Sequence, residues 1–147
     1  MDQTLLRMME FRYKGYYCSQ ILLLLALEAQ GKSNPDLIRA MGGLAHGYGS
    51  EEGVCGTLTG AACLIGLYAG KGIDGEDEDE LLKDLLKDLQ DWFIQTYGAQ
   101  YGGITCEAIM RGGTEIRQAC GAVVAETWAK ATELLTAAGF DISAGRD

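Results

Sequence analysis

Proline and histidine are almost missing from this 147-residue sequence, which contains one of each, Pro35 and His46. A single proline together with an apolar fraction of 48% is typical of a compact helical protein and excludes a proline-rich disordered chain. No segment alternates apolar and polar residues in the two-residue period of a β-strand. Because there is one histidine and no nucleophile-elbow motif, acyl-transfer catalysis has no support either.

Basic residues are few as well: 12 Lys and Arg stand against 21 Asp and Glu, which gives a formal net charge of −9. Nucleic acids and anionic membranes bind basic surfaces, so neither is expected as a partner. The uncharged run Val54–Gly70 is at the lower limit for a membrane span and is rich in glycine. The N-terminal stretch MDQTLLRMMEFR mixes charges into its apolar residues, unlike a signal peptide. We therefore expect a cytoplasmic protein with no membrane partner.

Apolar residues with helical spacing occupy most of the chain. The intervals are about 3–13, 17–29, 35–41, 55–68, 76–97 and 114–138. The sequence therefore predicts an all-α single domain over residues 1–147, a bundle of about five or six helices. The last residues, 140–147, are expected to form a loose C-terminal tail.

Several residues predict where these helices begin and end. Asn34 is expected to cap the third helix and Thr114 the last. The acidic run 76–80 is expected to form the first turns of the amphipathic helix, where it suits the positive end of the helix dipole, and Gly98 to end that helix. A shorter helix or turn is expected around Cys106.

The interval 55–68 is unusual for a helix because it contains glycine, which costs about 0.5–1 kcal/mol relative to alanine in a helix interior. Gly60, Gly66 and Gly70 belong to a series of small residues at three- and four-residue steps. Small residues on one face let a neighbouring backbone approach closely. We therefore expect this helix at the centre of the bundle, with the segment 21–27 packed around it.

Cysteine is the residue type that points to chemistry in this chain. The five cysteines are Cys18, Cys55, Cys63, Cys106 and Cys120. They form no CxxC or CxxCH motif, which excludes a thioredoxin-type motif, a zinc ribbon and covalent haem attachment. In a reducing compartment such cysteines are better explained as metal ligands or redox thiols than as structural disulfides.

The positions of the cysteines relative to the predicted helices distinguish them. Cys55 is expected at a helix start, where free N–H groups favour the thiolate, so it is the candidate reactive thiol. Cys63 lies about 12 Å further along the same helix and is expected in the core. On one straight helix Cys106 and Cys120 would be about 21 Å apart, but the Gly112–Gly113 pair permits a fold-back that brings them together.

The order of the cysteine motifs resembles a known family. YYCSQ is followed by a glycine-rich loop into VCGTLTGA, and then by two isolated cysteines, Cys106 and Cys120. This order resembles the C_GCAxxG_C_C family of redox-active proteins over about residues 13–138.

The resemblance implies an all-helical domain in which Cys18, Cys55, Cys106 and Cys120 hold a metal centre or do redox work. A related domain accompanies an iron–sulfur cluster in split-Soret cytochromes, so the resemblance also implies an iron–sulfur cluster or another thiolate-bound metal as a cofactor. His46, in the glycine-rich loop, is a candidate further ligand or second-shell donor.

Three functions stay open at this point. The cysteines can hold an iron–sulfur cluster or another soft metal for electron transfer. They can instead act without metal as thiol/disulfide redox pairs, with Cys55 attacking and Cys18, Cys106 or Cys120 as its partner. The chain can also be a helical interaction module with buried cysteines and no catalysis. The sequence does not identify a redox partner, and it leaves open whether the protein is an enzyme or a homo-oligomer.

Overall fold

The computed structural model describes residues 2–111 and 116–146, without the side chains of Arg111 and residues 116–119. Over this part of the chain the regular structure is helical, apart from one isolated antiparallel bridge between Val54 and Thr105. The expected break at Gly112–Gly113 and the expected cap Thr114 lie outside the described residues.

The described helices agree with the prediction of an all-α fold. Their order is α1 (Gln3–Tyr13), α2 (Cys18–Ala29), α3 (Pro35–Met41), the 3₁₀-helix η1 (Gly42–Leu44), α4 (Ala45–Tyr48), α5 (Gly56–Ala69), α6 (Leu82–Phe93), the π-helical turn η2 (Ile94–Gly98), α7 (Ala99–Tyr101), α8 (Cys106–Arg111) and α9 (Ile116–Ala137). Among these, six α-helices contain seven residues or more, as the expected five or six helices require.

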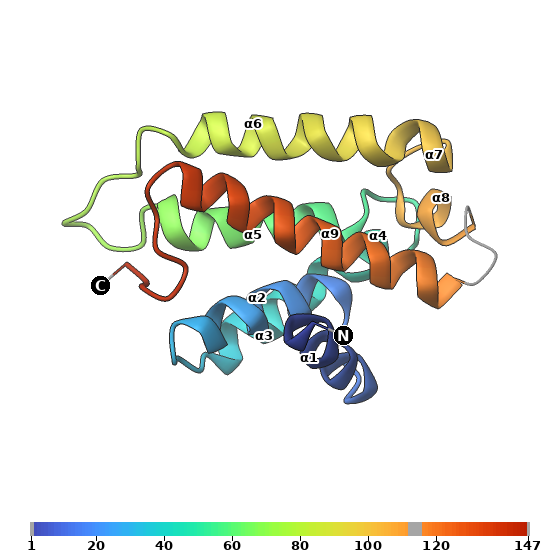
Figure 1. Cartoon of the computed structure of the whole chain (residues 1–147), viewed down its shortest axis with the longest axis horizontal. Helices are drawn as coiled ribbons and strands as arrows, with labels where there is room; N and C mark the ends of the chain where they lie inside the picture. The colour runs from blue at the N-terminus through green and yellow to red at the C-terminus, as the bar shows by residue number, and fades with distance from the viewer. Residues whose placement is uncertain (1, 112–115, 147) are drawn as a thin grey trace.

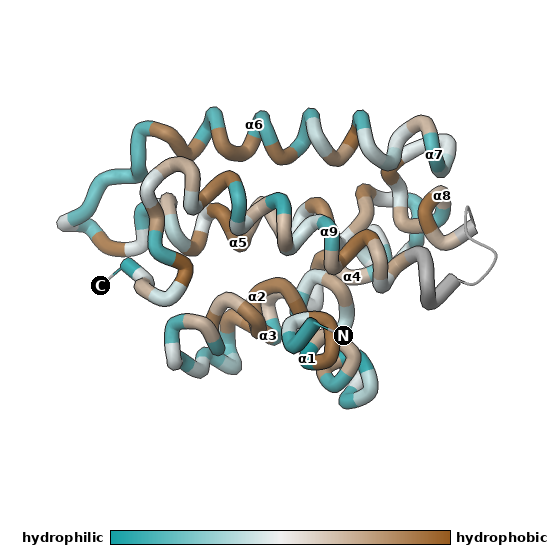
Figure 2. Tube along the Cα trace, viewed as in Figure 1, coloured by the Kyte–Doolittle hydropathy of each residue, from teal (hydrophilic) through white to brown (hydrophobic). Residues whose placement is uncertain are grey.

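Helix α5 lies at the centre of the bundle, as predicted. It packs against α2, α6 and α9, and its Leu64, Ile65 and Tyr68 are at most 1% exposed. Figure 1 shows α6 along one side of the molecule, α5 and α9 in the middle, and α2 and α3 on the other side. The apolar residues of α6 face the other helices and its polar residues face outward (Figure 2), which is the pattern of an amphipathic surface helix.

The close approach of α5 and α2 explains one of the helix glycines. A Cβ atom at Gly60 would lie 2.8 Å from the Cα of Ser19, which leaves no room for a side chain. The hydroxyl of Ser19 is buried there and donates a hydrogen bond to the carbonyl of Met41 at 2.8 Å. Gly66 does not have the expected packing role, because its Cβ position is open to more than 4 Å.

The start of α3 is confirmed, but the limits predicted for α6 are wrong. Asn34 caps α3 by accepting a hydrogen bond from the N–H of Leu37 at 3.1 Å. The acidic run 76–80 precedes α6 instead of forming its first turns. Gly98 has helical dihedral angles, so the helical conformation continues past it. The helical stretch ends at Gly102, whose φ is +75°.

The C-terminal segment is docked and not loose, which corrects the prediction for 140–147 as far as residue 146. The hydroxyl of Tyr68 donates a hydrogen bond to the carbonyl of Ile142 at 2.7 Å. Arg146 donates to the carbonyls of Gly70 and Asp77, the second at 2.7 Å. The tail thereby satisfies carbonyl groups at the end of α5 and in the connection to α6.

Candidate functional site

Four cysteines reach one region of the fold from four different segments. Cys18 is the first residue of α2, Cys55 is the residue that precedes α5, Cys106 is the first residue of α8, and Cys120 lies near the start of α9. Cys55 and Cys106 are buried, with 7% of each exposed, whereas Cys18 and Cys120 are partly exposed. Every cysteine of the chain is a free thiol in this structure.

A short antiparallel ladder joins the segments that contain Cys55 and Cys106. It consists of the Val54–Thr105 bridge, flanked by hydrogen bonds from the N–H of Cys55 to the carbonyl of Ile104 at 2.8 Å and from the N–H of Cys106 to the carbonyl of Gly53 at 3.0 Å. Side chains alternate between the faces of such a ladder. Cys55 and Cys106 therefore lie on its same face, opposite to the bridged pair.

The sulfur of Cys18 lies beside Gly56, the residue that follows Cys55. A Cβ atom at Gly56 would lie 3.0 Å from the Cys18 sulfur and 2.8 Å from the carbonyl oxygen of Leu44. The residue after Cys55 is thus glycine at a position where the Cys18 sulfur fills the space of a side chain. A hydrogen bond with Thr57 lowers the pKa of Cys18, but burial and the charge of Cys55 raise it to about 11.

Electrostatic coupling shows that Cys120 belongs to the same group. Burial is the largest cause that raises the pKa of Cys18, Cys106 and Cys120, and the negative charge of Cys55 is the next in each case. Cys106 also interacts with Cys18, Cys120 and Glu51, and its pKa rises to about 12. The four sulfurs are therefore close enough to repel one another as thiolates. We call Cys18, Cys55, Cys106 and Cys120 the four-cysteine centre.

Cys63 lies apart from the four-cysteine centre, as expected, but it is not in the core. The residue is exposed, and burial by its neighbours is the one cause that raises its pKa. The prediction of a core position was wrong because α5 is apolar nearly all round, so its sequence does not mark the exposed side.

Arg12 is a cation beside the centre that sequence reasoning did not find. It hydrogen bonds to Cys120, and both this bond and its charge lower the pKa of that thiol, opposing the effects of burial and of Cys55. Its guanidinium nitrogen Nη1 lies 3.4 Å from the position that a Cβ atom at Gly121 would occupy. An arginine at the end of α1 carries no local signal for this contact, because about a hundred residues separate it from Cys120.

Met110 adds a fifth sulfur atom. The Cys106 thiol donates a hydrogen bond to the Met110 thioether, with 3.4 Å between Sγ and Sδ. The two residues are one turn apart on α8, a spacing that places side chains on the same helix face. That spacing was visible in the sequence and could have singled out Met110.

The glycine-rich loop before Cys55 contains non-glycine residues in the left-handed backbone conformation. Non-glycine residues His46, Tyr48 and Glu51 have positive φ angles of 54°, 63° and 68°, a conformation that costs such residues energy and is common at functional sites. Gly47 contacts the backbone of Gly53 so closely that a Cβ atom there would lie 2.6 Å from the Gly53 oxygen. The loop thereby positions the Gly53 carbonyl that accepts the Cys106 hydrogen bond.

His46 is exposed and its ring contacts Tyr17, the residue before Cys18, with 4.6 Å between the ring centroids in an edge-to-face arrangement. Within residues 2–111 and 116–146, no three side chains of His, Cys, Asp or Glu are placed to hold a metal ion together. A role of His46 as a metal ligand therefore stays a prediction.

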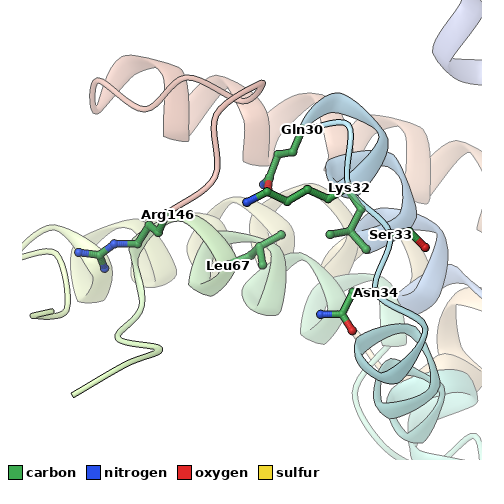
Figure 3. Close-up of a pocket in the computed structure, with 7 residues that line it drawn as sticks. Gln30, Lys32, Ser33, Asn34, Leu67 and Arg146 are labelled. Carbon is green, nitrogen blue, oxygen red and sulfur yellow. The ribbon is translucent and has the colours of Figure 1, made fainter. Parts of the chain in front are cut away.

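Two surface cavities lie elsewhere. One of about 310 Å³ is lined by Gln30, Lys32 and Leu67 among others (Figure 3). In Figure 3 the guanidinium of Arg146 points away from the other labelled side chains, in agreement with its bonds to backbone carbonyls. A groove of about 690 Å³ separates α1 from α9 and includes Leu5 and Trp128. No cysteine lines either cavity.

The fold and the four-cysteine centre define a helical protein with clustered thiols, and comparison with known families agrees. The family model described as "Putative redox-active protein (C_GCAxxG_C_C)" matches residues 16–134. The chain belongs to this family. Comparison with curated proteins and with solved structures gives no match. None of the described helices combines the length and the apolar character that crossing a membrane requires.

Proposed function

We propose that the four-cysteine centre is the redox centre of this protein. The observation that carries the proposal is geometric: the Val54–Thr105 ladder joins the segments of Cys55 and Cys106, and the Cys18 sulfur lies against Gly56, the residue after Cys55. The electrostatic interactions among Cys18, Cys55, Cys106 and Cys120 agree with this arrangement. Ionising more than one thiol of this group at a time is unfavourable, since each thiolate raises the pKa of the others. Membership of a family described as redox-active supports the same function.

Thiol–disulfide exchange is the chemistry that these residues can perform by themselves. A thiolate of the centre attacks a disulfide of the substrate and releases one substrate thiol, leaving a mixed disulfide. A second cysteine of the centre then attacks this mixed disulfide, forms an internal disulfide and releases the other substrate thiol. Two protein thiols are oxidised and one substrate disulfide is reduced, so atoms and electrons balance. The sequence led us to expect that Cys55 attacks first, but Cys55 is buried, whereas Cys18 and Cys120 are partly exposed. We therefore propose a partly exposed cysteine for the first attack and Cys55 as the second cysteine.

An iron–sulfur cluster is the second candidate, and the donor set is chemically suitable for it. Four cysteines are the usual ligands of [2Fe–2S] and [4Fe–4S] clusters. A single tetrahedral metal ion binds sulfur at about 2.3 Å and needs sulfurs within about 4 Å of one another. The described residues contain no such group of three or more ligands, which disfavours a single ion. Cys18, Cys55, Cys106 and Cys120 would hold a cluster, which would supply one-electron transfer.

The cellular compartment and partners follow from the same chemistry. Five free thiols and no disulfide suit a reducing compartment, so we propose that the protein works in the cytoplasm. The partner in the first candidate function is a protein or small molecule with an accessible disulfide. Because Cys120 and Cys18 are the partly exposed members of the centre, such a partner would meet one of these two first.

One purification distinguishes the candidates. The protein is purified without oxygen, its absorption spectrum is recorded, and iron and sulfide are measured. Colourless protein that loses two thiols reversibly on incubation with oxidised glutathione, with the new disulfide mapped inside the four-cysteine centre, supports thiol exchange. Visible charge-transfer bands with bound iron and sulfide support the cluster.

Cysteine variants provide the control. Cys63→Ser should leave either result unchanged, because Cys63 lies apart from the centre. Cys55→Ser should remove the disulfide or the bands. Colourless protein whose four thiols form no internal disulfide would contradict both forms of the proposal and favour an interaction module.

A further inference from the structure

The contact between Cys106 and Met110 places two soft sulfur atoms 3.4 Å apart on one turn of α8. Cys106 is 7% exposed, and Met110 is partly exposed, so the pair spans from the interior to the surface. A hydrogen bond accounts for the distance between the Cys106 and Met110 sulfurs. However, a hydrogen bond from a thiol does not require a thioether, because an oxygen atom could accept it as well. A thioether is a weak acceptor and, in contrast, a good ligand for soft metal ions.

We propose that Cys106 and Met110 form a binding site for a soft monovalent metal ion, Cu(I), at the edge of the four-cysteine centre. The site uses the same cysteines as the proposed function and requires them to be reduced and free of an iron–sulfur cluster. It adds a metal class and a ligand, Met110, that thiol exchange does not need.

The geometry suits this ion. Thiolate and thioether ligands select Cu(I) over harder cations. Two sulfurs that each bind a first-row metal at about 2.3 Å can be at most about 4.6 Å apart. The Sγ–Sδ distance of 3.4 Å lies inside this limit, and the flexible methionine side chain can open it further. Cu(I) replaces the thiol proton of Cys106, which is released to solvent.

The surroundings of the pair favour a cation. Glu51 lies close enough for its charge to act on Cys106, and so do Cys18, Cys55 and Cys120 when they are ionised. Cys55 lies on the same face of the ladder as Cys106, so it is a candidate for a third sulfur ligand. The absence of three clustered His, Cys, Asp or Glu side chains does not bear on this site, because a methionine supplies one of its ligands.

The test uses full-length, reduced, metal-free protein under anaerobic conditions, titrated with Cu(I) against the chromophoric chelator bicinchoninate. Met110→Leu, which keeps the size of the side chain, should lower the Cu(I) affinity by at least the tenfold that loss of an outer-shell partner typically costs. Cys106→Ser should lower it further. Met9→Leu, at an exposed methionine on α1, and Cys63→Ser, at an exposed cysteine on α5, are the matched controls and should retain wild-type affinity.

A second measurement uses the wild-type chain, so it does not depend on how a variant folds. With ¹³C-methyl-labelled methionine, the NMR signal of Met110 should shift on addition of one equivalent of Cu(I), while those of Met8, Met9 and Met41 stay in place. Wild-type affinity in Met110→Leu, an unshifted Met110 signal, or no binding of Cu(I) at all would overturn the proposal. These results leave the disulfide assay untouched, since Met110 has no thiol, so failure of this site and failure of the redox function can be told apart.

Discussion

The sulfur of Cys18 occupies the space in which a side chain at Gly56 would lie. A Cβ atom at residue 56 would approach this sulfur to 3.0 Å and the Leu44 carbonyl oxygen to 2.8 Å. The glycine that follows Cys55 therefore has a specific steric role: it lets a thiol from α2 reach the start of α5.

Replacing this glycine should disturb the centre. We expect Gly56→Ala to lower the free energy of unfolding by about 1–3 kcal/mol through overpacking, because the Leu44 carbonyl is part of the backbone and cannot easily move away. The displaced Cys18 should also react faster with iodoacetamide. A urea melt and site-resolved alkylation measure the two effects. Gly43→Ala, at an open position in the preceding segment, is the control and should change neither.

The contact between α2 and α5 can be tested with two glycines of the same helix. Gly60→Ala brings a methyl group to 2.8 Å from the Ser19 Cα, so we expect the free energy of unfolding to fall by about 1–3 kcal/mol. Gly66→Ala meets open space and should instead stabilise the protein by about 0.5–1 kcal/mol, because alanine is the better helix former. Urea melts give the free energy of unfolding of both variants. If the two substitutions changed it in the same direction, α5 would not be packed as described.

Removing Cys55 should make the neighbouring thiols easier to ionise. Burial is the main cause that raises the pKa of Cys106 to about 12 and that of Cys18 to about 11, and the interaction with Cys55 raises both further. In Cys55→Ser the pKa of both thiols should fall part of the way towards the ordinary 9.0, so their thiolate fraction at a given pH rises. The measurement is the pH midpoint of alkylation at each site, mapped by mass spectrometry.

The control for this experiment is Cys63→Ser, which removes a thiol outside the centre and should leave both midpoints in place. If Cys55→Ser left the midpoints of Cys18 and Cys106 unchanged, the four sulfurs would not be close to one another in solution.

Arg12 should favour the thiolate of Cys120. Its hydrogen bond and charge lower the pKa of this thiol, so Arg12→Gln should raise that pKa and slow alkylation of Cys120 at neutral pH. At a pH above both pKa values the rates of variant and wild type should converge. Arg12→Lys retains the charge and should restore part of the rate. A rate that fell equally at all pH values would indicate lost access to the sulfur rather than lost charge.

The sequence predicted the helical fold better than it predicted the surroundings of the cysteines. Helical periodicity and an asparagine cap are local signals, and both Asn34 and the central position of α5 were found correctly. Gly98 was misread because a glycine ends a helix only where its neighbours do not continue the helical conformation, and here the π-helical turn through Gly98 is followed directly by α7, which ends at Tyr101.

The parts that were missed depend on contacts between distant segments. Arg12 lies beside Cys120 and Gly121 although about a hundred residues separate them, and nothing near residue 12 in the sequence encodes that contact. The ladder at Val54 and Thr105 is too short to leave an alternating pattern. Cys63 was misplaced because an almost wholly apolar helix has no polar stripe to show which side faces solvent.

The Val54–Thr105 bridge has a consequence for the order in which the protein is made. It joins positions separated by roughly fifty residues, which take about 3–10 s to translate at 5–20 residues per second. During that time the nascent chain contains Cys18 and Cys55 but neither Cys106 nor Cys120. An oxidant or a metal ion that reaches the growing chain therefore encounters two of the four cysteines of the centre, and the complete centre can form only after Cys120 has been synthesised.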